Sequence, residues 1–184
     1  MSEERFLALV QNSSWITAVL NACCSQNIKG YYVAGGAVTQ VVWNQIVGRA
    51  VHDQVKDVDV VYFDEGHTFE DQRCLEDLLN QSLPNKVPLD LKNQALVHSW
   101  YPSKFGHNIS PYRKTEDGID TWLPAFAVGV RLEQSGLSVY APFGLRDLFS
   151  MRIRPNRRQI TQPIYARMVE SFSRRWPEVT VEPW

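Results

Sequence analysis

The sequence has few cysteines and no Cys/His spacing that is typical of a zinc site. Its three cysteines are Cys23, Cys24 and Cys74, an odd number in which two are adjacent, so a disulfide framework is not expected. Small secreted proteins that are rich in cysteine usually depend on disulfide frameworks, which form in oxidising compartments. We therefore expect a reduced, cytoplasmic protein.

Long apolar runs and net charge are also lacking. No run approaches the ~20 residues of a membrane-spanning helix, and the first residues, MSEERFLALV, are acidic and unlike a signal peptide. No membrane partner is therefore expected. The formal net charge is −1, so no overall field attracts the chain to nucleic acid or to a membrane.

The charge is nevertheless uneven along the chain. Residues 1–103 hold 7 Lys and Arg against 12 Asp and Glu, whereas residues 104–184 hold 12 against 8. The basic half is either a source of anion contacts or ordinary surface variation. With 184 residues, 44% of them hydrophobic, we expect a single domain over 1–184, with a core at about 28–100 and a C-terminal mixed part at about 121–184.

Helical periodicity appears in six segments. The first two are ERFLALVQ and SSWITAVLNACCSQN, with Ser13 or Ser14 as N-cap of the second. The late segments are GLRDLFSM and QPIYARMVESFSRRW. Two others predict a defined apolar face: AVTQVVWNQIVG with Val38, Val41, Val42 and Ile46, ending at Gly48, and EDQRCLEDLLNQ with Cys74, Leu75, Leu78 and Leu79.

Short strands are predicted between these helices. They are GYYVAGG, VDVVYF, a segment from Val87 to Leu91, and a hairpin of residues 125–132 and 137–140 joined by EQSG. Residues 101–120 are irregular and hold either a short helix or a mobile active-site loop. The order of elements predicts an α/β (α+β) fold, a small mixed β-sheet flanked by helices.

Acidic residues in a run rich in strand formers are the most informative feature. Asp57 and Asp59 alternate in KDVDVVYFD and would share one face of a strand, where their like charges repel. Asp90 stands on the next strand, and Gly35–Gly36 form a turn into a helix whose N–H groups would suit a phosphate. Two divalent cations held by the three carboxylates would explain why such charges stand together.

These stretches resemble a known superfamily. VAGGAVTQVVWNQIVGR followed by KDVDVVYFD is similar to the signature of polymerase-beta-type nucleotidyltransferases. The stretches LDLKNQALVHSWYPSKFG, VYAPFGLRDLFSMRIRPN and RWPEVTV resemble a small bacterial nucleotidyltransferase-like family over nearly the full chain. The resemblance implies Asp57, Asp59 and Asp90 as catalytic and metal-binding residues, with Gly35, Gly36 and Lys92 as nucleotide-binding residues.

The resemblance implies a Mg²⁺-dependent nucleotidyltransferase with two ions, or Mn²⁺ in their place, that uses a nucleoside triphosphate. Its acceptor stays open between RNA, a protein and a small molecule. The alternative is a catalytically inactive nucleotide- or metal-binding, or partner-binding, module on the same fold. One departure favours this alternative, because no serine follows the first glycine. A second weakens any inference to tRNA end-adding activity, because Thr39 and Gln40 replace the Arg-Asp pair of tRNA nucleotidyltransferases.

The roles of several other residues stay open between alternative interpretations. Lys92 either neutralises the carboxylates or contacts a phosphate, or else it is solvated. His98 is either a base or a hydrogen-bonded structural residue. The basic residues 152–158 either bind phosphate or pair with the acidic half of the chain. Among the tryptophans, core packing is expected for Trp15, Trp43, Trp100, Trp122 and Trp176.

Overall fold

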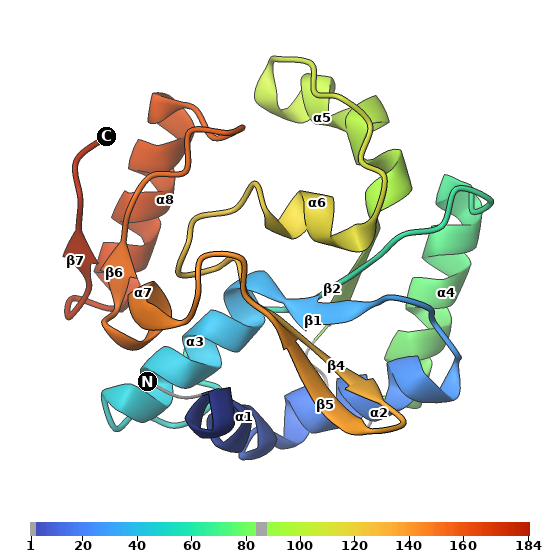
Figure 1. The fold of residues 1–184 in the computed structure, drawn as a ribbon, viewed down its shortest axis with the longest axis horizontal. Helices are drawn as coiled ribbons and strands as arrows, with labels where there is room; N and C mark the ends of the chain where they lie inside the picture. Colours follow the sequence, from blue (N-terminus) through green and yellow to red (C-terminus); the bar gives the residue numbers. More distant parts are fainter. Residues whose placement is uncertain (1–2, 84–87) are drawn as a thin grey trace.

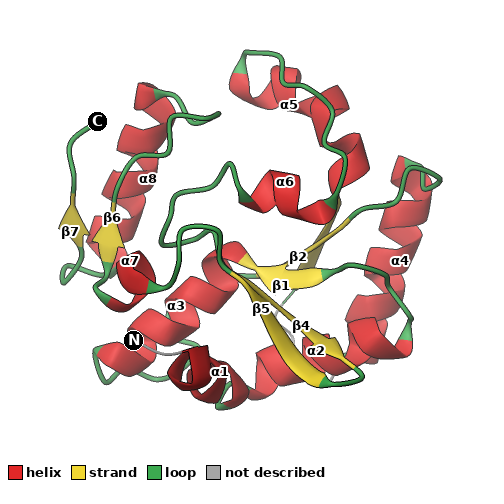
Figure 2. Ribbon diagram, viewed as in Figure 1, coloured by secondary structure: helices red, strands yellow, loops and turns green. Residues whose placement is uncertain are grey.

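The computed structural model describes residues 3–83 and 88–184. Its central sheet has the order β3-β2-β1-β4-β5, in which β2 and β3 are parallel and the other neighbours are antiparallel. Helices surround this sheet (Figure 2), which confirms the predicted small mixed sheet flanked by helices. The strands are β1 (Tyr32–Ala34), β2 (Val58–Tyr62), β3 (Leu89–Asn93), β4 (Gly129–Glu133) and β5 (Gly136–Tyr140).

The six helices that the sequence predicts all form, and the structure has a further helix at Val97–Phe105 that the sequence does not predict. Ser13 caps the second helix by accepting a hydrogen bond from the Ile16 N–H, and Gly48 follows the third in the left-handed conformation. Figure 1 shows α1, α2 and α3 on one side of the sheet and α5 and α6 on the other. The bounds are α1 (Glu3–Gln11), α2 (Ser14–Ser25), α3 (Gly35–Ile46), α4 (Phe69–Ser82), η1 (Gln94–Leu96), α5 (Val97–Phe105), α6 (Thr115–Ile119), α7 (Arg146–Phe149) and α8 (Gln162–Arg175).

The two faces of β2 and β3 differ in polarity. Val58, Val60, Leu89 and Leu91 are buried in the main core. Alternation places Asp59, Val61, Asp90 and Lys92 on the opposite face, and the parallel register pairs Asp59 with Asp90 and Val61 with Lys92. Two of the three acids that the sequence singles out, Asp59 and Asp90, therefore meet on one face of adjacent strands. The expected start of β3 at Val87 lies outside the described residues.

The inward face of α4 differs from the prediction. Only Leu79 of the predicted apolar set is buried, whereas Leu78 and Cys74 are exposed. The face toward β3 is instead polar: Gln72, Glu76 and Asn80 accept hydrogen bonds from the N–H groups of Asn93, Leu91 and Leu89 at 2.8–2.9 Å. These side chains satisfy the free edge of β3, which would otherwise expose a row of unpaired groups.

Two further expectations are wrong. Residues 125–127 form a turn, in which Phe126 and Ala127 donate to the Leu123 carbonyl, so β4 begins only at Gly129. Burial explains the misreading, because these apolar residues fill the core without pairing as a strand. Ile46 at the end of α3 is exposed. The irregular stretch 101–120 does contain a short helix, α6.

Aromatic residues connect α3 to α8. Trp43 is fully buried against Phe126, Phe172 and Trp176, with ring centroids 5.3–6.2 Å apart. The Trp176 indole N–H donates to Asn44 at 2.9 Å. A second small sheet, β6 (Arg152–Ile153) with β7 (Thr180–Val181), lies beside α8. The C-terminal part is thus packed against the helix that follows the double glycine.

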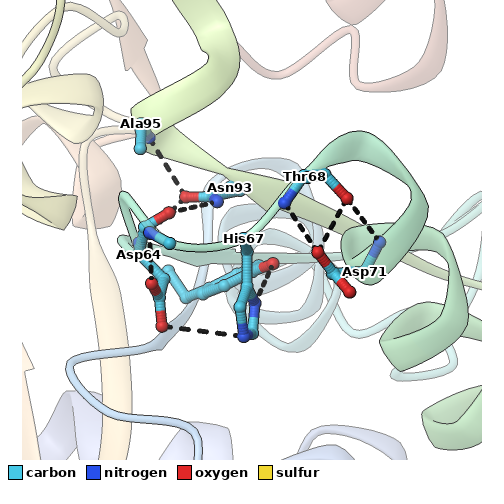
Figure 3. A network of polar contacts seen from close by, with 8 residues as sticks. Asp64, His67, Thr68, Asp71, Asn93 and Ala95 are labelled. Carbon is cyan, nitrogen blue, oxygen red and sulfur yellow. Dashed lines mark hydrogen bonds and ion pairs between the residues drawn. The ribbon is translucent and has the colours of Figure 1, made fainter.

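A polar network fixes the ends of β2 and β3 (Figure 3). Buried Asn93 accepts from the N–H groups of Asp64 and Ala95 and donates to the Asp64 carbonyl at 2.7 Å. His67 contacts both Asp64 and the Tyr62 hydroxyl. Asp64 is thereby used in the loop after β2 rather than with Asp59.

Within residues 3–83 and 88–184, no helix combines the length and the apolar character that crossing a membrane would require.

The polar face of α4 gives a stability prediction. Glu76→Ala leaves the Leu91 N–H unsatisfied at the edge of β3. We expect it to lower the free energy of unfolding by about 1–3 kcal/mol. The neighbouring Asp77→Ala removes the same charge from an exposed position and should change it by less than about 0.5 kcal/mol. Urea denaturation of both variants measures the difference, and equal effects would contradict the edge-capping role.

Candidate active site

A cavity of about 630 Å³ opens on the acidic face of the sheet. Its floor includes Gly35, Gly36, Asp59, Asp90 and Lys92, five of the six residues that the sequence predicts for the site. Its walls come from α5 and α8, which lie on opposite sides of α6 in Figure 1. The volume is within the usual range for a cavity that binds a small molecule.

Asp59 is fixed by the first turn of α3. The β1–β2 register, continued by one residue, places Asp59 opposite Ala34, where α3 begins. No side chain of Ala34 caps this helix. The Asp59 carboxylate faces the backbone N–H groups of Gly36 and Ala37 instead, and these groups favour its ionised form by lowering its pKa. A carboxylate at a helix N-terminus satisfies open donors and is stabilised by the helix dipole.

The double glycine is needed for this close approach. Gly35 has φ +66°, a conformation that favours glycine. A Cβ on Gly36 would lie 3.3 Å from Asp59 Oδ2 and 2.8 Å from Gln40 Nε2. The Gly35 N–H donates to the Val128 carbonyl at 3.1 Å. Of the N–H groups at this turn, that of Gly35 is thus directed at the Val128 carbonyl, and those of Gly36 and Ala37 act on the Asp59 carboxylate.

The pKa of the Asp59 carboxyl is raised. Burial, followed by the charges of Asp57 and Asp90, raises the pKa of Asp59 from 3.8 to about 7, although the two N–H groups oppose the shift. A carboxylate used only as a helix cap would have its pKa lowered. The arrangement therefore leaves negative charge that a cation in the cavity would neutralise.

Asp90 already has one cationic neighbour. Lys92 lies two residues along β3 on the same face, and its Nζ forms an ion pair with Asp90 Oδ1. This confirms the expected shared face and the reading in which Lys92 neutralises Asp90. Both side chains are partly exposed to the cavity. A ligand that binds Asp90 would have to bind beside Lys92 or displace its ammonium group. A displaced ammonium group would then be available to pair with an anion.

Asp57 is placed differently from the other two acids. It precedes β2, is exposed and is not among the residues that line the cavity. Among residues 3–83 and 88–184, no group of three His, Cys, Asp or Glu side chains is gathered closely enough to hold a metal ion. The donor type still fits Mg²⁺, which prefers carboxylate oxygens, and the register supplies two of them.

The rest of the cavity is aromatic and basic. Trp100, Tyr101 and Phe105 come from α5, and Trp122 lies against Gly35. Trp100 and Trp122 therefore line the cavity, whereas core packing was expected for them. Lys104 and Arg167 stand on the α5 and α8 walls, and neither forms an ion pair with any residue in the described ranges.

The basic cluster of residues 152–158 lies elsewhere and is largely neutralised. Arg154 pairs with Asp147 at 2.7 Å, and Arg158 pairs with Asp120 at 3.4 Å. Arg152 pairs with Asp147 and Glu182. These acids belong to the basic half of the chain rather than the acidic half. His98 does not line the cavity, and its buried Nδ1 has no partner among the described residues.

Sequence reasoning misses Gln40, Lys104 and Arg167 as cavity residues. Gln40 carries a usable signal, since it follows Gly36 by four residues and thus lies one helical turn above it. Lys104 and Arg167 carry none, because only the packing of α5 and α8 brings them to one cavity.

Comparisons with known proteins agree with this geometry. A family model described as Nucleotidyltransferase matches residues 21–181. A solved NMR structure, described as revealing a CCA-adding enzyme head domain, is similar with a TM-score of 0.79 and 21% identity. The match covers 100% of this chain and 97% of that one. At this identity the similarity shows the fold alone. The search of curated proteins found no match.

The raised pKa of Asp59 predicts a pH-dependent stability. A carboxyl with a pKa near 7 in the folded protein and 3.8 in the unfolded chain stabilises the fold fully below pH 4. This contribution is lost as the pH rises through about 7. In metal-free buffer, the Tm of the protein relative to that of Asp59→Asn should fall by about 5 °C between pH 5 and pH 8. Calorimetry at both values tests this, and a constant difference would contradict it.

Proposed function

The chain belongs to the nucleotidyltransferase family, and we propose that it transfers a nucleoside monophosphate from a nucleoside triphosphate to an acceptor hydroxyl. The acceptor oxygen forms a bond to the α-phosphorus, the bond between the α-phosphorus and its bridging oxygen breaks, and pyrophosphate leaves. The hydroxyl proton passes to a carboxylate or to solvent. The observation that carries the proposal is the Asp59–Asp90 pair on adjacent strands, within a cavity of nucleotide size.

Asp59 and Asp90 would hold Mg²⁺, and Asp57 would complete the set by turning toward them. Bound there, Mg²⁺ would neutralise the acids and the triphosphate and withdraw charge from the reacting phosphorus. Two ions are proposed, with Mn²⁺ as a substitute. Asp59 must be ionised to bind them, and its N–H donors hold its carboxylate in place. Asp90 would orient the acceptor hydroxyl and accept its proton.

The remaining floor and walls suit the rest of a nucleotide. Gly35 and Gly36 would border the phosphates, because the absence of side chains leaves space beside Asp59. Lys92, released from Asp90 by a metal ion, would contact a phosphate oxygen. The aromatic wall that includes Trp100 and Trp122 offers surfaces for a base. Lys104 and Arg167 would add attraction for an anionic substrate.

A catalytically inactive binding module on the same fold is the second candidate. Two observations favour it: Asp57 lies outside the cavity lining, and Lys92 occupies Asp90. Such a module would bind Mg²⁺ and a triphosphate without releasing pyrophosphate. The acceptor stays open between RNA, a protein and a small molecule. A cytoplasmic location is also proposed, and the three free cysteines support it.

The enzymatic proposal predicts Mg²⁺-dependent turnover of labelled nucleoside triphosphates with a panel of RNAs, proteins and small hydroxyl compounds. Asp59→Asn and Asp90→Asn should each reduce turnover by about 10²-fold or more, since each weakens the binding of a cation worth several kcal/mol. Asp77→Asn, an equivalent change on the outside of α4, should leave it unchanged. Pyrophosphate release measures turnover. Triphosphate binding without release would favour the inactive module, and equal turnover in the Asp59 variant would overturn the site.

A further inference from the structure

Gln40 is a buried polar side chain that faces the double-glycine turn. It is only 7% exposed, and it lines the cavity together with Gly36 and Asp59. Its Nε2 atom lies 2.8 Å from the place where a Cβ on Gly36 would stand. The amide is therefore directly above the turn, and glycine at position 36 is what leaves it room.

The orientation of this amide is set by Arg175. The Arg175 Nη1 donates to Gln40 Oε1 at 3.3 Å. A guanidinium can only donate, so it must face the amide oxygen, and the NH₂ group is turned to the cavity. Within residues 3–83 and 88–184, Gln40 Nε2 has no hydrogen-bond partner. This NH₂ group is held in place and is accessible from the cavity, so it is available to a ligand that brings an acceptor.

The backbone at this turn cannot supply that donor. The N–H groups of Gly36 and Ala37 are directed at Asp59, and that of Gly35 is directed at Val128. No serine hydroxyl stands beside them either. An anion that enters above the turn meets the Gln40 amide, in addition to Lys92 on the floor of the cavity.

We propose that Gln40 Nε2 donates to a phosphate oxygen of the triphosphate at the Gly35–Gly36 turn and that Arg175 is the positioning residue for Gln40. This inference rests on the proposed function, because it specifies how the same cavity holds its triphosphate. Gln40 takes the role that a hydroxyl at this turn would otherwise have.

Arg175 is itself firmly held. Its guanidinium lies over the rings of Phe172 and Trp176, 4.9 and 4.8 Å from their centroids, and it also donates to the Gln54 carbonyl. Asp57 is close enough to act on its charge. Arg175 therefore lies between Asp57, which acts on its charge, and the Gln40 amide beside Gly36. This explains why the guanidinium is kept partly buried beside the site.

The test uses tripolyphosphate as the probe, with isothermal titration calorimetry in saturating Mg²⁺. Gln40→Met keeps the length of the side chain and removes the donor. We expect it to weaken tripolyphosphate binding by about tenfold, as for a lost hydrogen bond to a charged group. The Tm should stay within a few degrees, and Mg²⁺ affinity without phosphate should not change. Gln81→Met, on the exposed side of α4, is the matched control and should bind normally.

A double-mutant cycle tests the positioning role. Arg175→Lys keeps the charge near Asp57 but loses the planar fork. It should weaken tripolyphosphate binding by about threefold when Gln40 is present and have no effect in the Gln40→Met background. A purely structural or long-range electrostatic role of Arg175 would weaken both backgrounds equally.

Each outcome decides the inference. If the wild-type protein binds tripolyphosphate and Gln40→Met binds it equally well, Gln40 has no such role, while the proposed function stands. If the wild-type protein binds none in the presence of Mg²⁺, both the inference and the proposed function are overturned. Weaker binding confined to the Gln40 and Arg175 variants, with the Gln81 control unchanged, supports the inference.

Discussion

The contacts between the Asp59 carboxylate and the first N–H groups of α3 are the interaction on which the site depends. They join β2 to the helix that follows β1, and they require a glycine pair at the junction because a side chain at Gly36 would crowd the carboxylate. In the parallel register of β2 and β3, Asp90 pairs directly with Asp59. The contact thus aligns Asp59 with the start of α3, and the pairing of β2 with β3 places Asp90 beside it.

The same contact explains both the cost of the arrangement and its use. The N–H donors offset part of the effect, but burial and then the neighbouring acids still raise the pKa of Asp59 to about 7. Lys92 offsets the charge of Asp90 locally. The cluster therefore remains short of positive charge, and the cavity above it is where a cation and a polyphosphate would supply the balance. Because the acids already occupy the backbone donors, phosphate recognition passes to side chains, and Gln40 is the one held above the turn.

Much of the fold and part of the site could be predicted from the sequence. Alternation in VDVVY and LDLK gave the correct face for Asp59, Asp90 and Lys92, because a strand with one buried side has only one register that buries its valines and leucines. The glycine pair indicated a close approach at the start of α3. The group that lies close to the glycines is the Asp59 carboxylate. The sequence pattern alone could not show whether a carboxylate of the protein or a phosphate of a ligand would lie there.

The remaining features depend on contacts between distant segments. The polar face of α4 follows from its place at the free edge of β3, which periodicity cannot show. The aromatic wall, Lys104 and Arg167 meet only because α5 and α8 close over the sheet. Asp57 lies one residue outside β2, so the alternation rule stops just before it.

A crystal structure with Mg²⁺ and a non-hydrolysable nucleoside triphosphate would test the central claim most directly. We predict a cation on Asp59 and Asp90, phosphate oxygens beside Gly36 and the Gln40 amide, and the base against the aromatic wall. The account would be contradicted by a triphosphate bound away from these acids, or by acids that hold no cation while the nucleotide occupies the cavity.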